Sequence, residues 1–152
     1  MSEANKALVR RWFEEVWNQG REKTIDELFA ADGVAHGLGD TEADTRGPAG
    51  FKPFFRNLRG SFPDLHMTVE DAIAEGDKVM VRVLVKGTHR GGELGVAPTG
   101  RPIGIAGIVL VRISGGQIVE AWNSWDQLGL LRQIGALPTA AAGKDRFLTE
   151  GA

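Results

Sequence analysis

The sequence predicts an α+β protein in which helices pack on one face of a bent antiparallel sheet. Apolar residues recur at helical spacing between residues 8 and 58, and from residue 65 onward they alternate with polar ones. Short turns at 75–77 and 114–116 join the alternating segments, which is typical of hairpins. Because the helical segments precede the strands instead of alternating with them, the α+β class is favoured over a parallel α/β sheet.

The first helix is expected over residues 8–17 and ends near Asn18-Gln19-Gly20. Large aromatic residues on one stripe of a helix usually pack in the core, and that is the first interpretation of this stripe. Its members are Leu8, Val9, Trp12, Phe13, Val16 and Trp17.

Two more helices are expected in the N-terminal half. Thr24 and Glu27 fit a capping box that would begin a short second helix. A short strand at 34–36 and a polar, acidic loop at 39–47 follow. Pro48 then suits the first turn of a third helix. The apolar face of this helix would be formed by Phe51, Phe54, Phe55 and Leu58.

The remaining elements are predicted to be strands, followed by one short helix. Alternation begins at Leu65, and valines at every second position from 79 to 85 mark one face of a long strand. His89 falls on that valine face. A strand at 103–113, a return strand at 117–126 and a short helix at 128–134 complete the domain, which we place at residues 1–138. Residues 139–152 are predicted to form a flexible tail.

Composition limits the possible functions. A chain of 152 residues, of which 42% are hydrophobic and 25% charged, is long enough for one core and too short for two. The net charge of −2 gives no basic field for nucleic acid. There is no cysteine, apolar membrane span or signal-peptide core. No nucleic-acid or membrane partner is therefore expected, and a cytoplasmic location is the default.

Asp126 is the principal candidate for chemistry. It follows Trp122 and Trp125, and desolvation by indole rings would raise the pKa of a carboxyl group and make it a usable proton carrier. Trp122 and Ser124 share the strand parity of Asp126 and would flank it on the pocket side. The alternative is that Asp126 only caps the helix that begins at the next residue. Both interpretations fit the sequence.

Several motifs resemble the SnoaL-like polyketide cyclases, a family within the superfamily of nuclear-transport-factor-two-like folds. The resemblance covers roughly residues 4–137. In the second half it is carried by the segments 87–91 and 98–101, by GQIVEAW at 116–122, by Asp126, and by LLRQIG at 130–135. In the first half it is carried by WNQG at 17–20, His36 and Gly47-Pro48.

The resemblance implies a cone-shaped, curved antiparallel sheet that encloses an apolar pocket together with three N-terminal helices. It also implies a homodimer formed through the outer face of the sheet. Cyclases of this family close a ring by intramolecular aldol condensation without a metal or organic cofactor, and their catalytic aspartate matches Asp126. A hydrophobic small molecule is the expected partner.

The expected pocket wall follows from the same resemblance. Where these cyclases place a glutamine and a histidine two residues apart, this chain has Gly107 and Val109. The pocket is therefore expected to be more apolar, and His36 and His89 are the other candidates for a catalytic proton donor. The three histidines lack metal-ligand spacing, so no metal is expected. The expected substrate-binding residues are Trp12, Phe13, Trp17, Phe55, Ile105, Gly107, Val109, Trp122 and Ser124.

Three functions compete. The first is a cofactor-free enzyme that uses Asp126 as general acid and base on a hydrophobic carbonyl compound. The second is a non-catalytic protein that binds an apolar ligand in the same cone, which Gly107 and Val109 favour. The third is an epoxide hydrolase-like activity, which needs an Asp-Arg-Asp set of which only Asp126 can be named here.

Overall fold

The computed structural model describes residues 2–39 and 43–137, so the predicted tail at 139–152 and its boundary at 138 lie outside the described residues. The helices are α1 (Ser2–Arg11), η1 (Trp12–Asn18), α2 (Glu22–Leu28), α3 (Gly47–Ser61) and α4 (Gln127–Gln133). The strands are β1 (Phe29–His36), β2 (Thr45–Arg46), β3 (His66–Glu75), β4 (Lys78–Thr88), β5 (Pro102–Ser114) and β6 (Gln117–Trp125). None of these helices is long and apolar enough to span a membrane.

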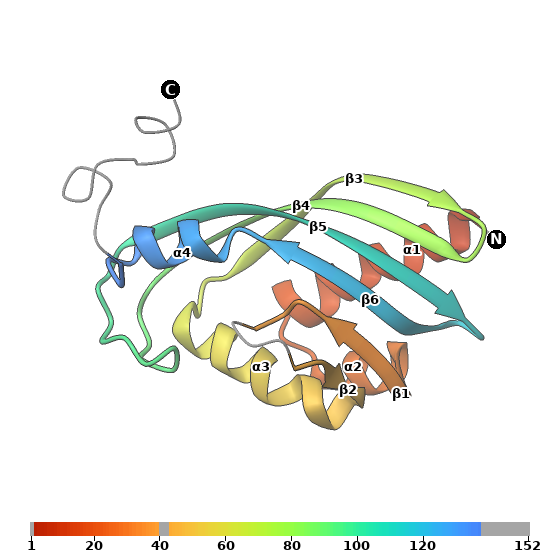
Figure 1. The fold of residues 1–152 in the computed structure, drawn as a ribbon, viewed down its shortest axis with the longest axis horizontal. Coiled ribbons are helices and arrows are strands. Elements are labelled where there is room, and N and C mark those ends of the chain that lie inside the picture. The colour runs from red at the N-terminus through yellow and green to blue at the C-terminus, as the bar shows by residue number, and fades with distance from the viewer. Residues whose placement is uncertain (1, 40–42, 138–152) are drawn as a thin grey trace.

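The predicted α+β class with helices on a curved sheet is confirmed. The strands form one sheet in the order β2-β1-β6-β5-β4-β3, and the long strands β3 to β6 arch over the helices (Figure 1). One detail differs from the expected antiparallel sheet, because β1 pairs parallel to β6. The strand β1 also begins earlier than expected, since Phe29 and Ala30 continue directly from α2 and are buried.

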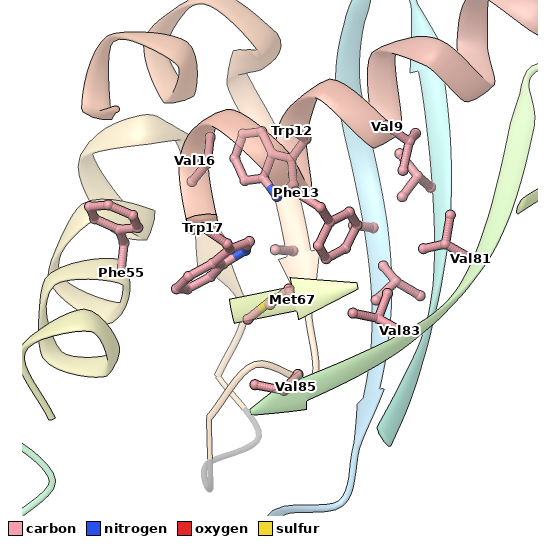
Figure 2. Packing of buried hydrophobic residues seen from close by; sticks show 14 of the residues in the cluster. Val9, Trp12, Phe13, Val16, Trp17, Phe55, Met67, Val81, Val83 and Val85 are labelled. Atoms are coloured by element: carbon pink, nitrogen blue, oxygen red, sulfur yellow. The ribbon is translucent and has the colours of Figure 1, made fainter. Parts of the chain in front are cut away.

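The aromatic stripe of the first helix lies in a π-helical segment, η1, that continues α1. A π-helix has more than four residues per turn, so side chains at 12, 13, 16 and 17 share one face. All four are buried. Figure 2 shows Phe13 pointing toward Val83 of β4, while Trp17 lies close to Met67 of β3. This segment therefore packs between α3 and the concave face of the sheet.

The capping box expected at Thr24 is wrong. The helix α2 begins at Glu22, so Thr24 lies within it and is buried. The Thr24 hydroxyl donates a hydrogen bond to Glu15 Oε1 at 2.8 Å. The same carboxylate forms ion pairs with Arg11 and Arg21. The Thr24 hydroxyl is therefore hydrogen-bonded to a side chain of η1 and does not cap α2.

A β-bulge in β6 determines which of its side chains face the helices. Ile113 of β5 pairs with Ile118 and Arg112 pairs with Glu120, so Val119 is an extra residue. Before the insertion an even-numbered residue, Ile118, faces the helices. After it the odd-numbered residues Ala121, Asn123 and Trp125 do so. The even-numbered residues after the bulge face outward.

Candidate functional site

A cavity of about 420 Å³ lies between the helices and the concave face of the sheet. This volume is in the range of small-molecule sites. The expected residues Trp12, Phe13, Trp17, Ile105 and Val109 line it. Phe55 does not line it; it is buried beside Trp17, with ring centroids 5.4 Å apart. The neighbouring Phe54 lines the cavity instead.

The helical wall of the cavity is a cluster of aromatic rings. Phe51 of α3 lies 5.2 Å from Trp12 and 5.8 Å from Trp17, measured between ring centroids, and both contacts are tilted or edge-to-face. Phe29 of β1 packs against Phe51 at 6.0 Å. Such pairs bury a large apolar area in a specific geometry. The opposite wall is formed by aliphatic side chains of β4 and β5, among them Val85, Ile103 and Val111.

Polar groups reach the cavity at few points. Asn123 lies opposite Val109 in the sheet register, and both line the cavity. Trp125 Nε1 donates a hydrogen bond to Asn123 Oδ1 at 3.1 Å, and Asn123 Nδ2 donates to the carbonyl oxygen of His36 at 2.9 Å. Asn57, Glu93 and Gln127 are the other polar lining residues among those described. The sequence analysis did not identify these polar residues. Asn123 follows the bulge at Val119, which leaves no clear signal in the apolar pattern, and Glu93 lies in a loop, where residues have no periodicity.

Gly107 does not line the cavity, because the indole of Trp125 occupies the space beside it. A Cβ atom at position 107 would collide with the Trp125 ring. The two residues face each other across β5 and β6. The glycine therefore lets Trp125 lie flat on the strand, and the expected direct contact of Gly107 with a substrate is replaced by the indole.

The expectation that Trp122 and Ser124 face the pocket is wrong. Both are exposed on the outer face of the sheet, as the bulge in β6 requires. Trp122 stacks on His36 with ring centroids 5.6 Å apart. Neither residue lines the cavity.

Asp126 is exposed and does not line the cavity. It is the N-cap residue of α4, and its Oδ1 accepts a hydrogen bond from the Gly129 amide at 2.9 Å. The indoles expected to desolvate it point elsewhere: Trp122 lies on the outer face and Trp125 covers Gly107. The capping interpretation of this residue is therefore realised, and the desolvated carboxylate expected in the pocket is not found.

His36 lies outside the cavity, in an ion-pair cluster on β1 and β6. Its Nδ1 is 2.8 Å from Asp44 Oδ1 and its Nε2 is 2.7 Å from Glu120 Oε2. The hydrogen bonds to Glu120 and Asp44 raise the pKa of His36, because both carboxylates favour the imidazolium. In turn His36 lowers the pKa of Glu120, which Arg112 also contacts at 3.4 Å.

His89 directly follows the end of β4 and is fully buried, as expected for a histidine surrounded by apolar residues, but it does not line the cavity. The Thr99 amide donates a hydrogen bond to His89 Nδ1 at 3.3 Å, and the Thr99 hydroxyl lies 3.1 Å from the same atom. The ring packs on Phe62. The structure thus brings none of Asp126, His36 and His89 to the cavity. In the part of the chain that the structure describes, no group of three or more acidic or histidine side chains is arranged to hold a metal.

Comparison with known proteins shows similarity to one family over most of the chain. Residues 7–134 match the model of the family described as SnoaL-like polyketide cyclase. The aklanonic acid methyl ester cyclase DnrD of Streptomyces peucetius is 29% identical over 129 residues, which is 84% of this chain and 88% of that protein.

Solved structures agree with this relationship. IdmH of Streptomyces antibioticus is 32% identical, with a TM-score of 0.75 over 86% of this chain and 98% of IdmH. TsrD of Streptomyces laurentii is 27% identical, with a TM-score of 0.77 over 89% and 97%. A protein from Catenulispora acidiphila with a ketosteroid isomerase-like fold is 22% identical, with a TM-score of 0.71 over 86% of this chain and 93% of that protein. The two proteins share the fold.

Proposed function

The chain belongs to the SnoaL-like polyketide cyclase family, and we propose that it is a cofactor-independent enzyme that closes a ring in a hydrophobic, carbonyl-bearing small molecule. The cavity of about 420 Å³ is the observation that carries the proposal. Its aromatic and aliphatic walls suit a flat, apolar compound, and its few polar side chains suit the carbonyl oxygens of such a compound.

The proposed reaction is an intramolecular aldol addition. A base removes a proton from a carbon beside a carbonyl group, that carbon bonds to a second carbonyl carbon, and the resulting alkoxide takes up a proton. The product is an isomer of the substrate, so no oxidant, reductant or co-substrate is consumed. A water-poor cavity assists by keeping the reacting carbons together and by strengthening the hydrogen bonds to the carbonyls.

The proposal does not depend on which group moves the proton. The family resemblance points to Asp126, which does not line the cavity but is adjacent in sequence to Trp125 and Gln127, two residues that do. Asparagine caps helices as well as aspartate does, so the Asp126→Asn variant removes the acid while keeping the cap. Turnover by that variant tests this residue alone.

The function is tested with aklanonic acid methyl ester, the compound named for the relative DnrD. We expect chromatography with mass spectrometry to show conversion to an isomer of unchanged mass. The Val109→Phe variant would fill the cavity and block conversion. Its matched control is Ile108→Phe, the adjacent residue on the outer face of β5. Equal conversion by the two variants would contradict a reaction inside the cavity.

A non-catalytic binding role is the second candidate, and it is favoured by the apolar Val109 in the cavity wall and by the Trp125 indole that covers Gly107. Three of the four tryptophans, Trp12, Trp17 and Trp125, line the cavity, while Trp122 does not. An occupant would therefore quench fluorescence in wild type and in Trp122→Phe alike, and less in Trp125→Phe. Quenching by aklanonic acid methyl ester without any isomer would support this alternative.

We further propose that two copies associate through the outer face of the sheet, as the family resemblance implies. Apolar side chains line up across neighbouring strands on this face. The register pairs Ile73 with Met80, Met80 with Leu110, and Leu110 with Trp122. Ile73, Met80 and Trp122 are exposed by 67%, 37% and 37%. Such a row is larger than the scattered apolar residues of an ordinary surface.

A further inference from the structure

We propose that Glu93 is the general base and acid of the ring closure; this inference deepens the function proposed above and depends on it. Glu93 lies in the loop between β4 and β5, and it is the only ionisable side chain among the described residues that line the cavity. Asp126, His36 and His89 do not line it. A proton carrier must reach the reacting atom, and of these four groups only Glu93 borders the space that a bound compound would occupy.

The loop that carries Glu93 is fixed at its start to the end of α3. The amides of Arg90 and Gly91 both donate hydrogen bonds to the Ser61 carbonyl oxygen, at 2.9 and 3.1 Å. These bonds keep the loop against the helix that forms one wall of the cavity. Glu93 follows two residues later, and its neighbour Leu94 also lines the cavity.

The base of the same loop is closed by His89. Its amide donates to the Arg101 carbonyl at 2.9 Å, and its own carbonyl accepts from the Gly100 amide at 2.8 Å. Nδ1 of the buried His89 ring accepts a hydrogen bond from the Thr99 amide. His89 is thereby a positioning residue for the loop, which explains a fully buried histidine away from the cavity. A carboxylate on a loop anchored at both ends is held more precisely than one on a free loop.

Gly60 leaves room for the Glu93 carboxylate. A Cβ atom at Gly60 would lie 2.9 Å from Glu93 Cδ, whereas one at Gly91 would collide first with the Gly60 carbonyl oxygen and then with Glu93 Oε2. Gly60 lies in the last turn of α3, where glycine costs up to about 1 kcal/mol relative to alanine. The carboxylate therefore sits in a recess between α3 and the loop that any larger side chain would fill.

The position of this recess fits the chemistry. Glu93 is exposed, so it can take up and release protons, and an apolar compound that enters the cavity would displace water from it. Glu93 would remove the proton from the carbon beside the carbonyl group and return it to the alkoxide once the carbon–carbon bond has formed. Asn57, one turn before Gly60 on α3, also lines the cavity and offers an amide donor to a carbonyl oxygen.

The test compares variants with aklanonic acid methyl ester in D2O. Ring closure is followed by chromatography, and exchange of the acidic C–H for deuterium is followed by NMR. We expect Glu93→Gln to lower both rates by at least about 100-fold, the usual contribution of a general base. Quenching of tryptophan fluorescence by the same compound should change less than about threefold, because glutamine keeps the size of the side chain.

A second pair of variants moves the carboxylate without removing it. Gly60→Ala would push Glu93 out of its recess and is expected to lower ring closure about tenfold. Gly50→Ala is the matched control on the same helix, since its Cβ would meet nothing closer than 3.6 Å. It should leave the rate unchanged.

The outcomes separate the two proposals. If wild-type protein neither closes the ring nor exchanges deuterium, the proposed function is wrong and the role of Glu93 falls with it. If wild type is active and Glu93→Gln stays within threefold of it, only the inference about Glu93 is overturned. Loss of activity in Asp126→Asn together with full activity in Glu93→Gln would assign the proton transfer to Asp126 and would also overturn the inference about Glu93.

Discussion

At the residue scale, the contact between Gly107 and Trp125 controls the floor of the cavity. Alanine at 107 would collide with the indole, so we expect Gly107→Ala to lower the free energy of unfolding by about 1–3 kcal/mol, as overpacked cores do. Urea denaturation measures this loss. Gly104→Ala is the matched control on the same strand, because a Cβ there meets nothing within 4 Å. Equal stability of the two variants would contradict the tight contact, and Trp125→Leu should rescue Gly107→Ala.

The pH dependence of stability should report the His36 cluster. The pKa of His36 is raised by Glu120 and Asp44, so this contribution is fully present below the ordinary value of about 6.5 and is lost as pH rises through the folded pKa. The pKa of Glu120 is lowered, so its contribution is present above about 4.5 and is lost as pH falls. Both contributions coexist between about pH 5 and 6.5.

The His36→Gln variant isolates the histidine part. We expect it to be less stable than wild type by about 1 kcal/mol near pH 5.5, with the difference shrinking above pH 8, because the side chain is partly exposed and the ion pairs are screened. His66→Gln, which changes an exposed histidine on β3, is the control. Urea denaturation at a series of pH values gives the comparison, and a difference that grows with pH would have the wrong sign.

Residue spacing could predict part of the site. Trp12, Phe13, Trp17, Ile105 and Val109 were all expected at the pocket and all line the cavity, because alternation and helical periodicity hold in their elements. The outward side of Trp122 and Ser124 could not be predicted, since one inserted residue, Val119, reverses the parity of β6. Glu93 gave no signal either, because loop residues have no periodicity.

At the scale of elements, Asp126 and α4 provide a separable test of capping. Replacing Asp126 by alanine removes the hydrogen bond to the Gly129 amide and should cost about 1 kcal/mol of stability. Asp126→Asn should stay within about 0.5 kcal/mol of wild type. Because Leu130 and Leu131 of α4 line the cavity, hydrogen exchange of their amides should accelerate in the alanine variant alone. Equal exchange in both variants would contradict the capping role.

Most elements could be predicted because their apolar patterns are long. The strands β4 and β5 follow strict alternation, and α3 begins beside Pro48 as expected. The start of α2 could not be predicted, because Thr24 makes a tertiary hydrogen bond to Glu15 in place of a cap. The parallel pairing of β1 with β6 also escaped prediction, since it joins segments far apart in sequence and depends on how α2 directs the chain.

At the scale of the whole molecule, the outer face of the sheet predicts a dimer. Sedimentation equilibrium should give twice the chain mass of 16.4 kDa. Ile108→Glu places a charge on this face, beside the row of Ile73, Met80, Leu110 and Trp122, where Ile108 is 45% exposed. Removing a charge from water at an apolar interface is costly, so this variant should sediment as a monomer. Leu128→Glu, an apolar residue of α4 that is 53% exposed, is the control and should remain dimeric.

The cavity and the proposed dimer face use opposite sides of the same strands. On β5, Val109 lines the cavity while Ile108 and Leu110 point away from it, so association through the outer face leaves a cavity in each copy. The monomeric Ile108→Glu variant should therefore still bind aklanonic acid methyl ester, with fluorescence quenching within about threefold of wild type. Loss of quenching in the monomer would show that the second copy supports the cavity. A monomeric wild type would instead contradict the dimer and leave the cavity unaffected.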